Sequence, residues 1–340
     1  MNDKQENDLI EKPPLKKKIA NFFGDVKSKI FKNKPKKEGS LNRNKRNQTI
    51  FIVAMLAIPA VHWLIFWLYI NIQTIALAFQ DVRTSAFTFD NFKQVWTQLT
   101  SPVNNSIGIA LKNTLKYFGT TVLINIPLSL VISFFIYKRI AGYKFFRIMF
   151  YLPAIISGLS LVTAYTEFIN PNGPLGAIVK FFGGTPNSRS ALGRPETATT
   201  AILIYFIWTG FTTNVLLFTG GMSRIPVDIL EAAKLDGCGP ARELTTILFP
   251  LIWPTFSTQL IFTMTGLFNS TGPILLFTNG QYETSTLAFW IFSQVYGNGV
   301  VGGSGTYNLV SCAGLCFTIA GVPLILLARK LVNKVDAVEY

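Results

Sequence analysis

Apolar stretches long enough to cross a bilayer recur along this sequence, and they restrict its fold more than any other feature. The first, from Thr49 to Phe79, exceeds the roughly 20 residues that a membrane-spanning helix needs. Lipid offers the backbone no hydrogen-bond partners, so such stretches are expected to be helical. With 49% hydrophobic and only 14% charged residues among 340, the chain is also too apolar for a soluble domain of its size. The sequence therefore predicts an all-α integral membrane protein.

The apolar pattern predicts six transmembrane helices. They cover approximately Thr49 to Phe79, Asn113 to Tyr137, Ile148 to Phe168, Thr199 to Gly220, Leu251 to Phe277 and Tyr307 to Leu327. The third span is interrupted by Pro153 and Gly158, and residues 170–197, rich in Gly, Pro, Asn and Ser, are expected to form an external loop.

The net charge of +14 is unevenly distributed. In a soluble protein it would suggest a nucleic-acid partner, but here the cations gather in residues 1–47, in the loop at 138–147 and after the last span. By the positive-inside rule, both termini are predicted to be cytoplasmic, and no nucleic-acid partner is expected. The stretch from Leu15 to Phe31 has the spacing of a basic amphipathic helix that could rest on anionic lipid; a disordered basic tail is the alternative.

These patterns predict four parts. Residues 1–47 form a basic cytoplasmic tail, 48–107 the first transmembrane helix and an external segment, 108–332 a core domain with five transmembrane helices, and 333–340 a cytoplasmic tail.

A polar segment, Ser223 to Pro250, lies between two apolar spans on the predicted cytoplasmic side. Pro226 fits the first turn of a short helix ending near Leu235, and Ser223 can cap it. Gly237 suits a left-handed helix stop, and Pro240 can open a second helix. The segment is therefore expected to fold as two short helices joined by a glycine elbow.

This segment resembles the EAA loop of permease subunits of ATP-binding-cassette (ABC) importers, whose pattern is EAA, three residues, Gly, nine residues and Ile-x-Leu-Pro. The matching positions are Glu231, Ala232, Ala233, Gly237, Ile247 and Pro250, with Phe249 in place of the usual Leu. An ordinary amphipathic loop lying on lipid headgroups is the alternative.

The resemblance implies the type I importer permease fold and a helix that docks into a cytoplasmic ATPase subunit. The residues expected to take part in this coupling are Pro226, Leu230, Glu231, Ala232, Ala233, Asp236 and Gly237. The expected partners are ATPase subunits, a second permease subunit, an extracellular solute-binding protein, membrane lipid and the transported carbohydrate. ATP and Mg²⁺ would belong to the ATPase subunits, so no cofactor is expected on this chain.

Groups that would carry chemistry are scarce. The sequence lacks a G-x-x-x-x-G-K-[ST] loop, and no His, Cys and carboxylate cluster has metal-binding spacing. Cys312 and Cys316 share a helix face, where packing and a metal or redox pair are alternative roles. His62 is either a packed residue or a proton carrier, and Glu167 is either a solvated helix end or a substrate contact. The scarcity of such groups predicts a non-catalytic chain, and the resemblance implies that it is a subunit in the bacterial plasma membrane.

Neutral polar and aromatic side chains within the spans are candidates for a substrate path. They are Asn125, Ser129, Tyr165, Trp208, Asn214, Asn269, Ser270, Thr271, Asn308 and Ser311. Hydroxyls and stacking faces of sugars suit such a lining. For each residue, packing between helices is the alternative role. The group from Asn269 to Pro273 is the first candidate, because a Gly-Pro break at membrane depth usually lines a cavity.

The sequence from Phe51 onward resembles the sugar branch of these permeases, the group of the maltose and glycerol-3-phosphate types. The resemblance implies a carbohydrate importer working by alternating access. Two alternatives stay open: a permease for a peptide, amino acid or polyol, and a membrane-embedded enzyme or scaffold without transport activity.

Overall fold

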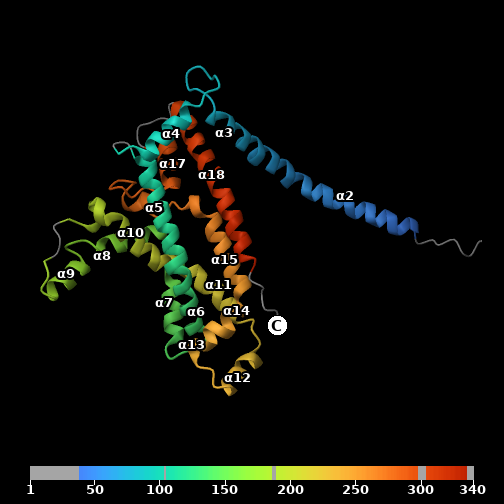
Figure 1. Cartoon of the computed structure of the whole chain (residues 1–340). Helices are drawn as coiled ribbons and strands as arrows, with labels where there is room; N and C mark the ends of the chain where they lie inside the picture. The colour runs from blue at the N-terminus through green and yellow to red at the C-terminus, as the bar shows by residue number, and fades with distance from the viewer. Residues whose placement is uncertain (1–37, 103–104, 186–188, 298–303, 335–340) are drawn as a thin grey trace, which may run out of the picture. The chain divides into compact units, whose positions relative to one another are not determined.

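The computed structural model describes residues 38–102, 105–185, 189–297 and 304–334. Apart from one isolated bridge between Gln80 and Phe87, regular structure in these ranges is helical, as predicted. The chain divides into two compact units, Met1–Asn71 (unit 1) and Ile72–Tyr340 (unit 2) (Figure 1). The amphipathic helix predicted from Leu15 to Phe31 lies outside the described residues.

The first predicted span is confirmed. It consists of α2 (Glu38–Trp63), a π-helical stretch η1 (Leu64–Tyr69) and α3 (Ile70–Ala78), which continues from unit 1 into unit 2. From Lys45 to Ala78 the helix is 34 residues long, and its apolar window has no buried residue. Such an uncovered apolar surface is what a helix solvated by lipid chains presents.

Three long helical spans in unit 2 match predicted spans. Ser106–Tyr137 contains α5 (Ser106–Thr120), η2 (Thr121–Asn125) and α6 (Ile126–Tyr137); Pro195–Met222 contains α10 (Pro195–Gly210) and α11 (Thr212–Met222); the third is α18 (Ser304–Val332). The first begins seven residues before the predicted start at Asn113, because the preceding residues pack against α4 and α17 and extend the helix.

Two further predicted spans are broken helices. α7 (Tyr143–Ile155) and α8 (Gly158–Phe168) meet at 108°, and the helices Pro240–Leu251 and α15 (Trp253–Thr265) meet at 73°. The fifth span then continues as η5 (Leu267–Asn269) and α16 (Ile274–Phe277). Among the described residues, four helices can cross a membrane, or six if each bent pair forms one span. The upper count agrees with the six predicted spans.

The predicted external segments contain helices of their own. Residues 170–197, expected to form a loop, include α9 (Pro174–Phe181) and a 3₁₀ turn η3 (Ala191–Gly193), so that prediction was wrong. Pro174 starts α9 because its fixed φ suits the first helical position. Likewise, α4 (Asp90–Thr100) and α17 (Leu287–Tyr296) form between spans. Figure 1 places α4 and α17 at one end of unit 2, and the polar segment 223–250 at the other.

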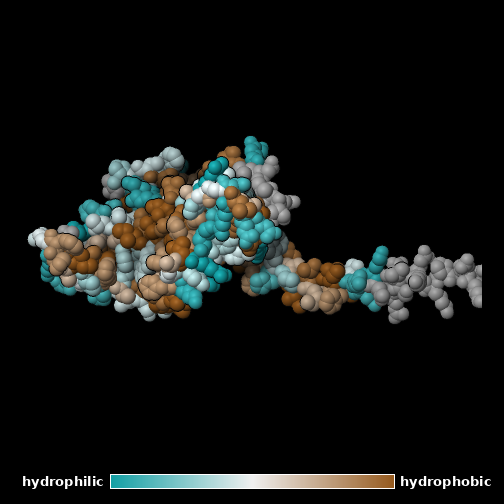
Figure 2. Space-filling view, turned by 90° about the horizontal axis from the view of Figure 1, so that it is seen from below, coloured by the Kyte–Doolittle hydropathy of each residue, from teal (hydrophilic) through white to brown (hydrophobic). Residues whose placement is uncertain are grey.

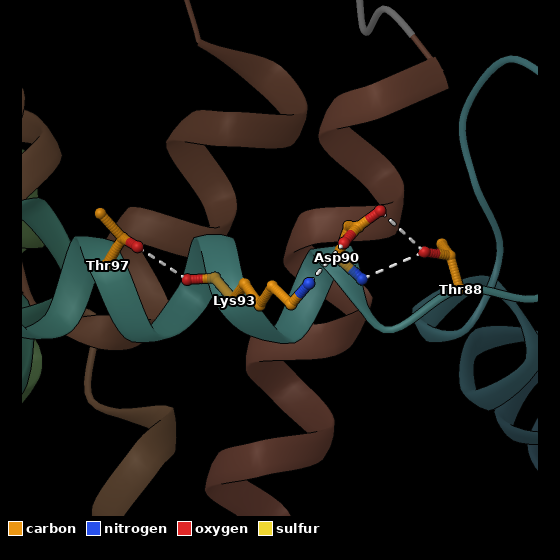
Figure 3. A network of polar contacts seen from close by, with 4 residues as sticks. All are labelled: Thr88, Asp90, Lys93 and Thr97. Atoms are coloured by element: carbon orange, nitrogen blue, oxygen red, sulfur yellow. Dashed lines mark hydrogen bonds and ion pairs between the residues drawn. The ribbon is translucent and has the colours of Figure 1, made fainter.

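The exposed side of α4 carries a short polar network (Figure 3). Asp90 accepts a hydrogen bond from the Thr88 hydroxyl at 3.0 Å and pairs with Lys93 at 3.2 Å. These two groups hold the pKa of the Asp90 carboxyl below its usual value. The network fixes the start of α4 and is exposed.

The opposite side of α4 packs into unit 2. Val95 belongs to a buried cluster with Ile107, Ala110 and Leu309, and the buried Asn91 amide donates to the Ala78 and Gln80 carbonyls at 3.0 Å each. The compact unit that begins at Ile72 therefore includes the external segment, which shares its apolar contacts with the core helices. The predicted boundary at residue 107 stays a prediction.

Much of the surface is apolar, as a lipid-solvated protein requires. Figure 2 shows brown apolar side chains over much of the visible face. Large exposed examples are Leu123, Ile155 and Phe262, with 65–79% of their surface uncovered. Several polar side chains inside unit 2 bond to backbone carbonyls. Asn113, for example, is 2% exposed and donates to the Glu283 and Ser285 carbonyls.

Replacement of Asn113 by Ala is expected to destabilise unit 2 by about 2 kcal/mol, because it removes two hydrogen bonds made by a buried amide, to the Glu283 and Ser285 carbonyls. The melting temperature of the detergent-solubilised protein should fall by several degrees, whereas Gln94→Ala, which removes an amide at the surface of α4, should leave it unchanged. Equal melting temperatures for both variants would show that these hydrogen bonds contribute nothing.

Candidate functional site

The polar segment folds as a short helix, a glycine turn and a second helix, as predicted. α12 runs Val227–Leu235, and Pro226 occupies its N-cap position, just before the first turn. Asp228 lies in that first turn, where the helix dipole favours a negative charge. The predicted cap by Ser223 was wrong, because its hydroxyl donates back to the Thr219 carbonyl in α11 at 2.8 Å.

The predicted left-handed stop at Gly237 is confirmed. Gly237 has φ +72°. Its N–H donates to the Lys234 carbonyl at 3.0 Å, and the Cys238 N–H donates to the Ala233 carbonyl at 2.9 Å. This pair of bonds is the Schellman pattern, which satisfies the last carbonyls of α12 and turns the chain sharply.

The inner face of α12 is buried against the transmembrane helices. Leu230 packs with Phe134, Leu248 and Ile252, and Ala233 lies beside it on the same buried face. Burying a leucine side chain contributes about 2 kcal/mol. Leu230, expected from the resemblance to serve coupling, therefore anchors α12 within this chain and is covered by its own helices.

The outer face of α12 presents a continuous exposed ridge. We define the outer ridge as Val227, Asp228, Glu231, Ala232 and Leu235. Leu235 is 90% exposed, and it was not among the predicted coupling residues. Its spacing of four from Glu231, and of eight from Val227, could have identified it, because such residues share one helix face. Pro226, Asp236 and Gly237 are exposed around the ridge.

The second helix leads directly into the fifth span. It comprises α13 (Pro240–Arg242), the π-helical stretch η4 (Glu243–Leu248) and α14 (Phe249–Leu251). Pro240 stands at its first position, as predicted. The chain bends by 73° at Ile252, two residues after the end of the polar segment at Pro250.

A partly buried ion pair holds this second helix to α6. The Lys138 ammonium lies 2.9 Å from Glu243 Oε1 and 2.8 Å from Oε2. Glu243 is only 2% exposed. The sequence did not predict this pair, because 105 residues separate its members. The sequence signal that could have indicated a buried charge was the carboxylate of Glu243, which lies among apolar residues of the second helix.

Two predicted pathway residues lie together. Tyr165 and Trp208 line a cavity of about 420 Å³ with Ala164, Phe168 and Ile204. Tyr205 stands between them, with ring centroids 5.2 Å from Tyr165 and 6.0 Å from Trp208. The cavity therefore offers aromatic faces suited to stacking.

Asn125 and Asn214 are buried in this conformation, at 1% and 5% exposure. The Asn125 side chain faces α10 at Gly210, where an added Cβ would lie 2.6 Å from Asn125 Nδ2. Neither the oxygen nor the nitrogen of the Asn125 amide has a hydrogen-bond partner within the described residues. A close-packed glycine thus lets an unpaired amide approach the α10 backbone.

The remaining candidates serve different local roles. The break predicted from Asn269 to Pro273 is present: η5 ends at Asn269, and Ser270, whose carbonyl accepts from the Thr286 hydroxyl at 2.6 Å, is extended. Asn269 and Thr271 are exposed. Asn308 donates to the Gln80 carbonyl at 2.6 Å, so its amide is engaged in packing.

Metal-binding groups do not gather in the part of the chain that the structure describes. Within those ranges, no three His, Cys, Asp or Glu side chains cluster closely enough to hold a metal ion. The absence of a cofactor on this chain stays a prediction.

Comparison with known proteins shows that the chain matches a transport-protein family. Residues 120–337 match the family described as "Binding-protein-dependent transport system inner membrane component", and this range contains the whole segment 223–250. The chain is also 25% identical over 246 residues to the multiple sugar-binding transport system permease protein MsmF of Streptococcus mutans, covering 71% of this chain and 82% of that protein.

Two solved structures share the fold. A bacterial ABC transporter involved in the import of the acidic polysaccharide alginate aligns with a TM-score of 0.71 at 21% identity, covering 88% of this chain and 100% of that one. The bacterial alginate transporter in complex with an alginate pentasaccharide-bound periplasmic protein gives 0.71 at 20% identity, covering 85% and 96%.

Replacement of Gly237 by Ala is expected to weaken the elbow by about 1–2 kcal/mol, because a Cβ strains the left-handed conformation. Backbone amides after α12 should then exchange with deuterium about 5- to 30-fold faster. Gly239→Ala is the matched control, since Gly239 has φ −74° and open space where a Cβ would be added. Identical exchange in both variants would contradict the assignment of strain to Gly237.

Proposed function

Because this chain belongs to the family of binding-protein-dependent transport system inner membrane components, we propose that it is the permease subunit of an ATP-driven carbohydrate importer. As a multi-pass protein of the plasma membrane, it would form half of a translocation pathway, completed by a second permease subunit. An extracellular solute-binding protein would deliver the sugar, as a periplasmic protein carries alginate in one structural neighbour.

The outer ridge of α12 carries this proposal. Leu230 and Ala233 fix the helix from inside, so that Glu231 and Ala232 are held outward in a defined orientation. A small side chain beside a carboxylate allows a partner's groove to approach closely and place a cation against Glu231. The proposed occupant of the ridge is a cytoplasmic ATPase subunit.

Energy for transport would come from that partner. ATP and Mg²⁺ would bind the ATPase subunits, and this chain would carry no catalytic residue. Closure of the two ATPases would push the outer ridge, and the packed contacts behind Leu230 would pass the displacement to the transmembrane helices. Alternating access of the pathway follows from that motion.

The aromatic residues that line the cavity favour a carbohydrate as the transported substrate. MsmF is by name a permease for multiple sugars. Tyr165, Tyr205 and Trp208 bring aromatic rings together beside a cavity, and aromatic rings stack on the apolar faces of sugars. We propose that Tyr165 and Trp208 contact the passing substrate.

Replacement of Glu231 by Lys is expected to reduce sugar uptake by more than about tenfold, since it opposes like charges at the proposed interface. The measurement is uptake and sugar-stimulated ATP hydrolysis by the complete complex in proteoliposomes, with a panel of sugars, peptides, amino acids and polyols as cargo. Glu196→Lys, a charge reversal at the start of α10, is the control and should transport normally.

Normal uptake with Glu231→Lys would refute the coupling role of the outer ridge. Stimulation of the wild-type complex only by a non-sugar solute would refute the carbohydrate assignment. Purification of the chain without any ATPase subunit would favour a scaffold without transport activity.

A further inference from the structure

Glu243 is a buried charge that the outer ridge does not use. Its carboxylate is 2% exposed, and both oxygens accept from the Lys138 ammonium at 2.8–2.9 Å. A buried carboxylate persists only where a partner compensates its lost hydration, and removal of one partner leaves an uncompensated charge. The pair therefore fastens the start of η4 firmly to Lys138.

Lys138 places this fastening at the end of a transmembrane helix. It is the C-cap residue of α6, where a cation also complements the helix dipole. The same end of α6 contributes Phe134 to the cluster that buries Leu230 and Leu248. The segment 223–250 thus contacts α6 in two ways, through the Lys138–Glu243 ion pair and through the apolar cluster that contains Phe134.

Two serine hydroxyls connect α6 to α11. The Ser133 hydroxyl donates to the Ser129 carbonyl of its own helix at 2.6 Å and shares that proton with the Val215 carbonyl of α11 at 3.0 Å. The Ser129 hydroxyl donates to the Asn125 carbonyl at 2.5 Å and lies 3.3 Å from the Phe211 carbonyl. Phe211 is the residue that separates α10 from α11. These bonds connect α6 to the interruption of the fourth span.

The amide of Asn125 lies one turn beyond Ser129. It is buried against Gly210, the residue before the break, and both of its polar atoms lack partners among the described residues. A buried amide without partners raises the free energy of this conformation.

We propose that the Lys138–Glu243 ion pair is the joint that transmits movement of the segment 223–250 along α6 to the break at Phe211. The proposal deepens the proposed function and depends on it. In this proposal Lys138 and Glu243 are positioning residues, which act through α6. Without the pair, only the apolar contact with Phe134 would connect the segment to α6, and less of the movement would reach that helix.

The test measures ATP hydrolysed per sugar transported by the complete complex in proteoliposomes. Glu243→Gln and Lys138→Met should each keep sugar-independent hydrolysis but raise this ratio about tenfold, because less of the motion is passed on. The conservative variant Lys138→Arg keeps the charge and should restore the ratio, as should the exchanged pair Lys138→Glu with Glu243→Lys. Arg139→Gln, the neighbouring exposed cation, is the matched control and should behave as wild type.

An unchanged ratio in both single variants would overturn the proposal. So would a parallel loss of hydrolysis and uptake in which Lys138→Arg is as defective as Lys138→Met, since that pattern indicates a requirement of packing alone. A wild-type complex without sugar-stimulated hydrolysis would instead defeat the proposed function, so the two failures are distinguishable.

Discussion

The need to pair every backbone polar group inside lipid governs this structure. Unbroken spans meet that need within the helix, but the interruptions require side chains from neighbouring helices. At Phe211, the carbonyl accepts from the Val215 N–H at 2.9 Å and lies 3.3 Å from the Ser129 hydroxyl, and the adjacent Thr212 hydroxyl donates to the Phe150 carbonyl at 2.9 Å. At the fifth-span break, the Thr286 hydroxyl donates to the Ser270 carbonyl. Hydroxyls on adjacent helices thus bond to backbone carbonyls at these interruptions and join those helices into one packed body.

The polar segment follows the same logic at the membrane surface. The Schellman bonds at Gly237 close α12, the cluster around Leu230 holds its inner face, and Glu243 receives its charge partner from another helix. Each device removes an unsatisfied group or an exposed apolar surface. Together they make a rigid elbow whose outer ridge is held in one orientation, which is a condition for receiving force from a partner.

The sequence predicted what depends on local pattern. Span number, the Gly237 stop and the second helix at Pro240 follow from apolar length and backbone preference. Contacts between residues far apart in the chain could not be predicted from the sequence, because no local pattern indicates that Lys138 pairs with Glu243, 105 residues later. Helix α9 was missed because Gly, Pro and Asn around it hid a short apolar stripe. The inward turn of Leu230 was missed since the helix face that packs depends on the tertiary arrangement.

The exposed Leu235 side chain affects the stability of the subunit in the cell before it assembles with its partners. Leu235, with nine-tenths of its surface exposed next to the small Ala232, forms an exposed apolar surface that water does not stabilise. When a groove of the ATPase subunit covers Leu235, this apolar surface is no longer exposed to water. Orphan copies would therefore be the ones recognised by quality-control proteases, and the cellular amount of this chain would follow the supply of its cytoplasmic companion.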